Sequence, residues 1–112
     1  MRRGDVFDAR LDPVEGSEQS WTRPVVIVSR NAINVHLSIV VVVPCTTYRP
    51  TMRLHPSRVL IHAPDGGLRV DSVALCEQVR AVAKDRFLRQ RGVLSPAALA
   101  LVEDGLRRTL DL

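Results

Sequence analysis

The sequence has 112 residues, a formal net charge of +4 and a pI of about 10.0, and it is 46% hydrophobic and 25% charged. This balance is typical of a single folded domain over residues 1–112 and excludes a chain too polar to bury a core. The longest apolar run, 39–43, is too short to span a membrane, and the N-terminus lacks an apolar signal segment, so a cytoplasmic protein is expected.

The first half of the chain has the pattern of β-strands. Residues 4–11 alternate between polar and apolar, and 25–29 are a β-branched apolar run. A turn is predicted at 31–34, followed by the strongest strand, 35–43, which Pro44 ends or kinks. Because the second half of that strand has no polar residue, one face should meet the core and the other a helix or a second subunit. This hints at a dimer.

The second half mixes loops, short strands and helices. Polar and basic residues over 46–55 predict an exposed loop. The elements expected after it are a strand at 59–61, a turn at 64–67, one long strand over 72–76 and 79–82 that carries Gln78, and a short helix at 84–90 that Gly92 stops.

The chain ends in a predicted helix. Ser95 is a suitable cap and Pro96 fits the first turn. An apolar stripe follows at helical spacing, formed by Leu99, Val102, Leu106 and Leu110. Gly105 within it costs roughly 1 kcal/mol relative to alanine. Short strands followed by terminal helices predict a mainly β, α+β fold, a small barrel with helices packed against it.

The cysteines and histidines give no sign of a metal site. Cys45 and Cys76 lie far apart and are predicted to be reduced core residues. The histidines also lack metal-ligand or acid–base spacing; His36 is interpreted as structural, and His55 lies in the basic loop. No metal and no cofactor are expected.

Arg23 is the residue that points most directly to a function. It lies two residues before the apolar run 25–29, where a permanent charge that was buried without a partner would be costly. Its planar fork of donors matches a pair of phosphate oxygens. The polar loop 12–19 just before it could bring a carboxylate and an amide to the same place. These are parts needed to bind and cut a phosphodiester, although Arg23 alone could equally end a strand and pair with a carboxylate.

Four segments, in order, resemble one family of proteins. They are Arg-Arg-Gly-Asp-Val at 2–6, Gly-Ser-Glu-Gln at 16–19 with Thr-Arg-Pro at 22–24, Pro-Cys-Thr-Thr at 44–47, and Asp-Ser-Val at 71–73 leading to Glu-Gln-Val-Arg at 77–80. The chain resembles toxins of the MazF/PemK family, the ribonuclease half of bacterial toxin–antitoxin pairs, over nearly its whole length. Two departures are Ser-Trp at 20–21, where a basic residue or glycine is common, and Cys-Thr-Thr at 45–47, where Ile-Thr-Ser is common.

The resemblance implies a fold and partners. The fold would be a homodimeric SH3-like barrel of the MazF/PemK/CcdB type. The activity would be metal-independent cleavage of single-stranded RNA at short sequences. The partner would be a labile antitoxin whose acidic C-terminal segment occupies the RNA groove.

The resemblance also implies residue roles. Arg23 would stabilise negative charge on the reacting phosphate, and Thr46 (with Thr47 in reserve) would hydrogen-bond a non-bridging oxygen. Glu18 is the one nearby carboxylate that would serve as general base, with substrate binding as its alternative role. The remaining RNA-binding residues would be Ser17, Gln19, Thr47, Arg49, Arg53 and Gln78. Taken alone, most of these residues are equally compatible with loop or strand positions of no catalytic importance.

Two alternatives stay open at this level. The same barrel occurs in toxins that bind DNA gyrase without nuclease chemistry, through residues on the C-terminal helix. Here that helix lacks a distinctive aromatic end, and a gyrase-binding toxin does not need Arg23 with Thr46. The second alternative is an inactive family member that only binds a partner, which retention of both residues argues against.

Overall fold

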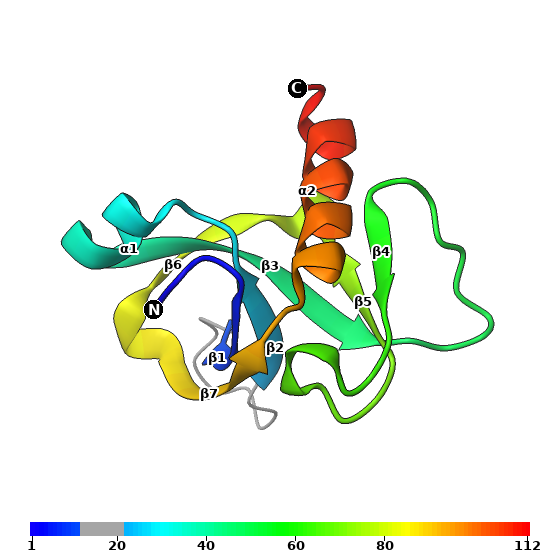
Figure 1. The fold of residues 1–112 in the computed structure, drawn as a ribbon, viewed down its shortest axis with the longest axis horizontal. Coiled ribbons are helices and arrows are strands. Elements are labelled where there is room, and N and C mark those ends of the chain that lie inside the picture. The colour runs from blue at the N-terminus through cyan, green and yellow to red at the C-terminus, as the bar shows by residue number, and fades with distance from the viewer. Residues whose placement is uncertain (12–21) are drawn as a thin grey trace, which may run out of the picture.

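The structure, a computed structural model, describes residues 1–11 and 22–112 (Figure 1). Its elements in chain order are β1 (Asp5–Arg10), β2 (Thr22–Ile27), α1 (Asn31–His36), β3 (Ile39–Thr47), β4 (Arg58–Ile61), the 3₁₀ turn η1 (Asp65–Gly67), β5 (Ser72–Leu75), the 3₁₀ turn η2 (Cys76–Gln78), β6 (Arg80–Ala83), the 3₁₀ turn η3 (Lys84–Arg86), β7 (Phe87–Val93) and α2 (Pro96–Leu110).

The strands form a curved antiparallel sheet in the order β4-β5-β3-β2-β1-β7, with β6 also paired to β3. The long strand β3 changes neighbours along its length: residues 39–42 pair with β6, and 45–47 pair with β5. The helix α2 stands against the sheet near β4 and β5 (Figure 1). A mainly β barrel with a C-terminal helix is therefore confirmed.

The core consists of two clusters, and β3 contributes to both. Val43 and Cys45 belong to the cluster that includes Val102 of α2, and Val40 and Val42 belong to the second. All four β3 side chains are fully buried. Both faces of this strand are thus covered within the chain, and α2 contributes to the cover of one of them, as one of the two predicted possibilities required; the burial of β3 therefore needs no second subunit.

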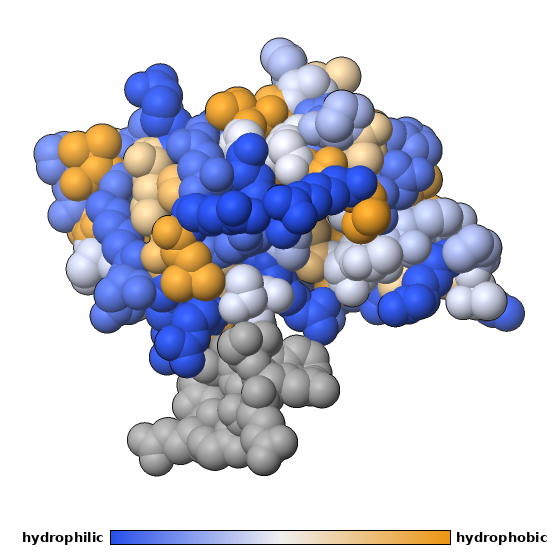
Figure 2. All heavy atoms as spheres, turned by 90° about the horizontal axis from the view of Figure 1, so that it is seen from below, coloured by the Kyte–Doolittle hydropathy of each residue, from blue (hydrophilic) through white to orange (hydrophobic). Residues whose placement is uncertain are grey.

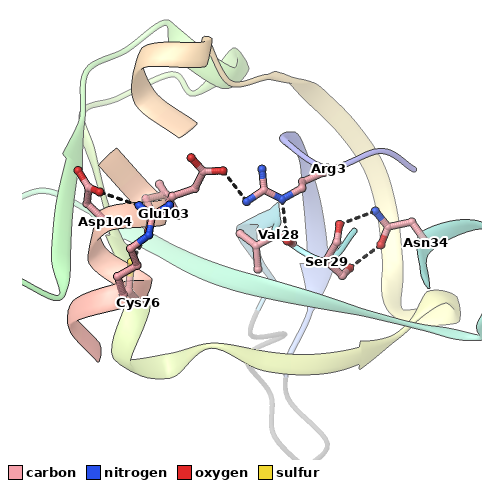
Figure 3. A network of polar contacts seen from close by, with 9 residues as sticks. Arg3, Val28, Ser29, Asn34, Cys76, Glu103 and Asp104 are labelled. Carbon is pink, nitrogen blue, oxygen red and sulfur yellow. Dashed lines mark hydrogen bonds and ion pairs between the residues drawn. The ribbon is translucent and has the colours of Figure 1, made fainter. Parts of the chain in front are cut away.

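The turn predicted at 31–34 is the short helix α1, and β3 begins only at Ile39. Buried Asn34 explains the difference: its Nδ2 donates to the carbonyl of Ser29 at 2.9 Å, and the Ser29 hydroxyl donates to its Oδ1 (Figure 3). The Ser29 hydroxyl also accepts the N–H of Val41 at 3.0 Å. This network winds the chain into one helical turn, against the β propensity of Val35.

Pro44 does not end β3, which continues to Thr47. The pairing with β6 stops at Val42, and the pairing with β5 starts at Cys45. Pro44 lies between these two ladders, where its missing N–H interrupts neither of them.

Two further predictions of secondary structure were wrong. The supposed long strand over 72–82 is interrupted by η2, so Gln78 lies on an exposed turn rather than on a strand. The helix predicted at 84–90 is η3 followed by β7, which pairs with β1. Phe87 of β7 packs edge-on against Phe7 of β1, with ring centroids 5.5 Å apart. This tertiary pairing overrides the helix propensity of the segment.

The terminal helix is confirmed, including its cap. The Ser95 hydroxyl accepts the N–H of Ala98 at 3.1 Å. Gly105 is required by packing, because a Cβ there would lie 2.6 Å from the sulfur of Cys76. Arg3 ties the N-terminus to this helix through Glu103 Oε2, 2.6 Å from its Nη2, while its Nε donates to the carbonyl of Val28 (Figure 3). Neither α1 nor α2 is long and apolar enough to cross a membrane, and the described residues hold no other α-helix.

The two cysteines are buried and free, as predicted. Burial raises the pKa of Cys45 to about 12 and that of Cys76 to about 11. Because the thiolate is the reactive form, both should resist iodoacetamide at mildly alkaline pH in the folded protein and react readily in denaturant. Mass spectrometry of the alkylated protein checks this. Native labelling as fast as labelling in urea would contradict it.

Candidate functional site

Arg23 and Thr46 lie on neighbouring strands, near the ends of those strands. The antiparallel pairing of β2 with β3 sets Val26 opposite Val43 and Val25 opposite Pro44. Continued by two residues along each strand, the same register sets Arg23 opposite Thr46. Side chains alternate along a strand, so these two residues belong to the same face of their strands. Both are half-buried, and on its other side Arg23 pairs with Ala9 of β1. The structure thus brings the two main predicted catalytic residues to one region.

A cleft of about 170 Å³ opens beside the end of β3. Its lining comes from four places in the chain: Pro24 of β2, Thr46 and Thr47 of β3, the segment Leu68, Arg69, Val70 and Ser72, and Arg91 of β7. Next to it, the Tyr48 N–H donates to the carbonyl of Asp71 at 2.8 Å and so joins the end of β3 to the segment before β5. It combines three hydroxyl groups with two guanidinium groups, a lining suited to a hydrogen-bonding anion.

Arg91 is held by a buried carboxylate. The Asp8 side chain of β1 is 10% exposed, and it accepts from Arg91 Nε at 2.5 Å and from Arg89 Nε at 3.2 Å. Arg91 is the extra residue of a β-bulge in β7, because Val6 pairs with Gly92 and Phe7 with Gln90. Bulges commonly redirect a side chain near a functional site.

The turn η1 brings the other cleft arginine into place. Gly66 and Gly67 both have positive φ. A Cβ on Gly67 would lie 2.1 Å from the carbonyl oxygen of Arg91 in β7, and a Cβ on Gly66 would lie 2.9 Å from the side chains of Leu94 and Val6. Leu68, which follows, is buried, and Arg69 then emerges at the surface. The glycine pair therefore sets Arg69 and Arg91 on one cleft.

The other predicted RNA-binding residues are more dispersed. Arg49 and Arg53 lie on the exposed connection between β3 and β4, and Gln78 is exposed on η2; none of the three lines the cleft. Ser17, Glu18 and Gln19 lie outside the described residues. The sequence reading missed Asp8, Arg69 and Arg91, which are brought together only by the pairing of β1 with β7 and by η1.

A second polar cluster lies at the opposite end of β5 from Ser72. His55 Nδ1 is 2.7 Å from the Ser57 hydroxyl, and Arg58 forms an ion pair with Glu77 at 2.9 Å. Burial acts to raise the pKa of Glu77, but hydrogen bonding and the charge of Arg58 hold it below its usual value. Near the cleft, the Ala63 N–H and His62 lower the pKa of Asp71. Both carboxylates are therefore anions engaged in local contacts.

Hydrophilic side chains dominate the face shown in Figure 2, and the apolar ones form small separate patches. Within residues 1–11 and 22–112, no group of three His, Cys, Asp or Glu side chains is arranged to hold a metal ion. A polar face on a chain of net charge +4 suits a polyanionic ligand.

Comparison with known proteins agrees with this chemistry. Residues 2–110 match the model of the PemK-like, MazF-like toxin of type II toxin–antitoxin system. The chain is 38% identical to Endoribonuclease MazF9 of Mycobacterium tuberculosis, covering 100% of this chain and 98% of that protein. It is also 38% identical to Endoribonuclease MazF of Staphylococcus saprophyticus, covering 100% and 92%. Among solved structures, a mycobacterial endoribonuclease in complex with its cognate antitoxin superposes with a TM-score of 0.82, at 28% identity and with 100% and 96% covered.

Proposed function

The chain belongs to the family of PemK-like, MazF-like toxins of type II toxin–antitoxin systems, and from this premise we propose that it is an endoribonuclease that cleaves single-stranded RNA at short sequences. The observation that carries the proposal is the position of Arg23 and Thr46 on the same face of adjacent strands, beside a cleft with two arginines. The relatives are named as endoribonucleases, so the gyrase-binding alternative is not favoured.

In the proposed mechanism the RNA supplies its own nucleophile. The 2′-oxygen attacks the adjacent phosphorus as it loses its proton, the P–O5′ bond breaks, and the 5′-oxygen takes up a proton. The products are a 2′,3′-cyclic phosphate and a 5′-hydroxyl. No metal or cofactor takes part in these steps.

Each residue has a distinct part in this mechanism. Arg23 donates to the non-bridging oxygens, whose negative charge grows in the transition state, and Thr46 donates a further hydrogen bond. Arg23 is a poor base, because a guanidinium almost never loses its proton near neutral pH. Glu18 is the proposed base. Ser17, Gln19, Thr47, Arg49, Arg53 and Gln78 are the proposed contacts to the rest of the RNA.

The proposed partners follow from the family. The protein would form a homodimer and would be neutralised by a cognate antitoxin with an acidic C-terminal segment. It would act in the cytoplasm, where its cleavage of RNA would inhibit translation and growth. Val35 on α1, Leu37 just after it and Ile39 at the start of β3 are exposed apolar residues that offer surface for a second copy to cover. The net charge of +4 favours association with acidic side chains.

The test of this proposal is cleavage of RNA without metal. The purified protein, incubated with a mixed-sequence single-stranded RNA in EDTA, should cut it at discrete sites that primer extension maps. The 3′ fragment should carry a 5′-hydroxyl, and the 5′ fragment a cyclic phosphate. The same RNA with 2′-O-methyl groups should stay intact because it lacks the nucleophile. Intact RNA in the first incubation, or 5′-phosphate ends, would contradict the proposal.

A further inference from the structure

The Arg91 side chain is fixed at one nitrogen and accessible at the others. Its side chain is 20% exposed and fixed through Nε by Asp8, whereas Arg89, which binds the same carboxylate, is 62% exposed and lies outside the cleft. No other contact of Arg91 side-chain nitrogens occurs among the described residues. The two terminal amino groups are therefore left to serve a ligand in the cleft.

The cleft has the chemistry of a phosphate site. Its lining supplies the Thr46, Thr47 and Ser72 hydroxyls and the cations Arg69 and Arg91, with no carboxylate among the lining residues that the structure describes. The Ser72 hydroxyl already donates to the carbonyl of Val70, which leaves the two threonines as hydroxyl donors. Hydroxyls on one side and a guanidinium fork on the other can bind the several oxygens of a phosphate.

The position of the cleft relates it to the reaction. Thr46, the proposed ligand of the reacting phosphate, is also part of the cleft wall. An RNA chain whose reacting phosphate lies between Arg23 and Thr46 would need only to continue past Thr46 to reach Arg91. The next phosphates along the chain would then lie in the cleft.

We propose that Arg91 binds a phosphate of the RNA next to the one that is cut, and that Asp8 is the positioning residue that fixes the Arg91 guanidinium for this contact. The inference rests on the proposed function and deepens it. Arg91 would contribute to substrate binding rather than to the chemical step. An acidic peptide is the competing occupant, since a carboxylate also fits a guanidinium fork.

The first test is the salt dependence of binding to a short mixed-sequence 2′-O-methyl RNA, which cannot be cut. Each phosphate contact on a single strand contributes about 0.7 to the slope of log affinity against log salt. Arg91→Gln should lower that slope by about this amount and weaken binding about tenfold. Arg89→Gln is the matched control: it removes the same charge from the same carboxylate, and the slope should not change.

The second test separates positioning from simple electrostatics. Asp8→Asn removes a negative charge beside the cleft, so charge alone would make RNA bind more tightly. If Asp8 positions Arg91, binding should instead weaken, by a factor of about three to ten. Arg91→Lys should keep the salt slope but lose affinity, because it keeps the charge without the fork. In cleavage assays these variants should raise KM more than they lower kcat, which mere loss of stability would not do.

The outcomes separate this inference from the proposed function. If the native protein does not bind RNA, both fail. If it binds and cuts RNA but Arg91→Gln has the same slope as Arg89→Gln, or Asp8→Asn binds more tightly, only the inference fails. Weakened binding of a glutamate-rich peptide by Arg91→Gln, with RNA binding unchanged, would assign the cleft to an acidic protein segment and overturn the inference.

Discussion

Arg23→Ala is expected to reduce the rate of RNA cleavage by about 10²- to 10³-fold, the effect of removing one donor fixed in advance on a developing oxyanion. Arg23 is half-buried at the start of β2, on the strand next to Thr46, where its guanidinium would contact the phosphate as negative charge develops in the transition state. Because the strand is held by the backbone pairing of Arg23 with Ala9, the fold should survive the loss of the side chain. Single-turnover cleavage in EDTA, with enzyme in excess, measures the effect on the chemical step.

Two further variants test whether the loss of rate is specific to the guanidinium of Arg23. Arg23→Lys keeps the charge but loses the planar fork, so its rate should lie between those of the native protein and Arg23→Ala. Arg30→Ala removes an exposed arginine beyond the other end of β2 and should leave the rate within about twofold, as a solvated residue far from the site does. A similar rate for Arg23→Ala and Arg30→Ala would remove Arg23 from the mechanism.

The sequence predicted those elements whose signals are local. The alternation of residues 4–11 predicted β1, and Ser95 with Pro96 marked the start of α2, because strand periodicity and helix caps depend on neighbouring residues. The segment 84–90 was misassigned for the opposite reason. Its strand conformation depends on pairing with β1, and in isolation nothing in Lys-Asp-Arg-Phe-Leu-Arg-Gln requires it.

The candidate site likewise contains residues that a local sequence signal marks and residues that only the tertiary pairing brings together. Arg23 and Thr46 can be predicted as site residues because one precedes and the other follows an apolar strand segment within a motif, and the register of β2 and β3 brings them to one region. Asp8 and Arg91 are 83 positions apart, and neither belongs to a motif. The pairing of β1 with β7, which sets Asp8 opposite Arg89, brings them together, and the register of that long-range pairing leaves no local signal in a single sequence.

Gly67→Ala is expected to lower the free energy of unfolding by about 3 kcal/mol, the largest stability effect predicted for a single methyl group in this chain. Gly67 has φ +74°, which L-residues rarely adopt, and an added Cβ would lie 2.1 Å from the carbonyl oxygen of Arg91. That neighbour is backbone within β7, so it cannot rotate away. Urea unfolding measures the change, and the melting temperature should fall by more than about 10 °C.

Gly4→Ala is the matched control, because it shares the backbone strain without the close approach. Its φ is +95°, but its nearest contact would be Leu99 Cδ2 at an ordinary 3.4 Å, so a loss of only about 1–2 kcal/mol is expected. Gly67→Asn separates the two causes further: asparagine tolerates positive φ, yet it carries the same Cβ and should remain strongly destabilising. If Gly67→Ala proved no worse than Gly4→Ala, β7 would have to move away from η1. The cleft between Arg69 and Arg91 would then have to be wider and more adaptable than the close contact of Gly67 with Arg91 implies.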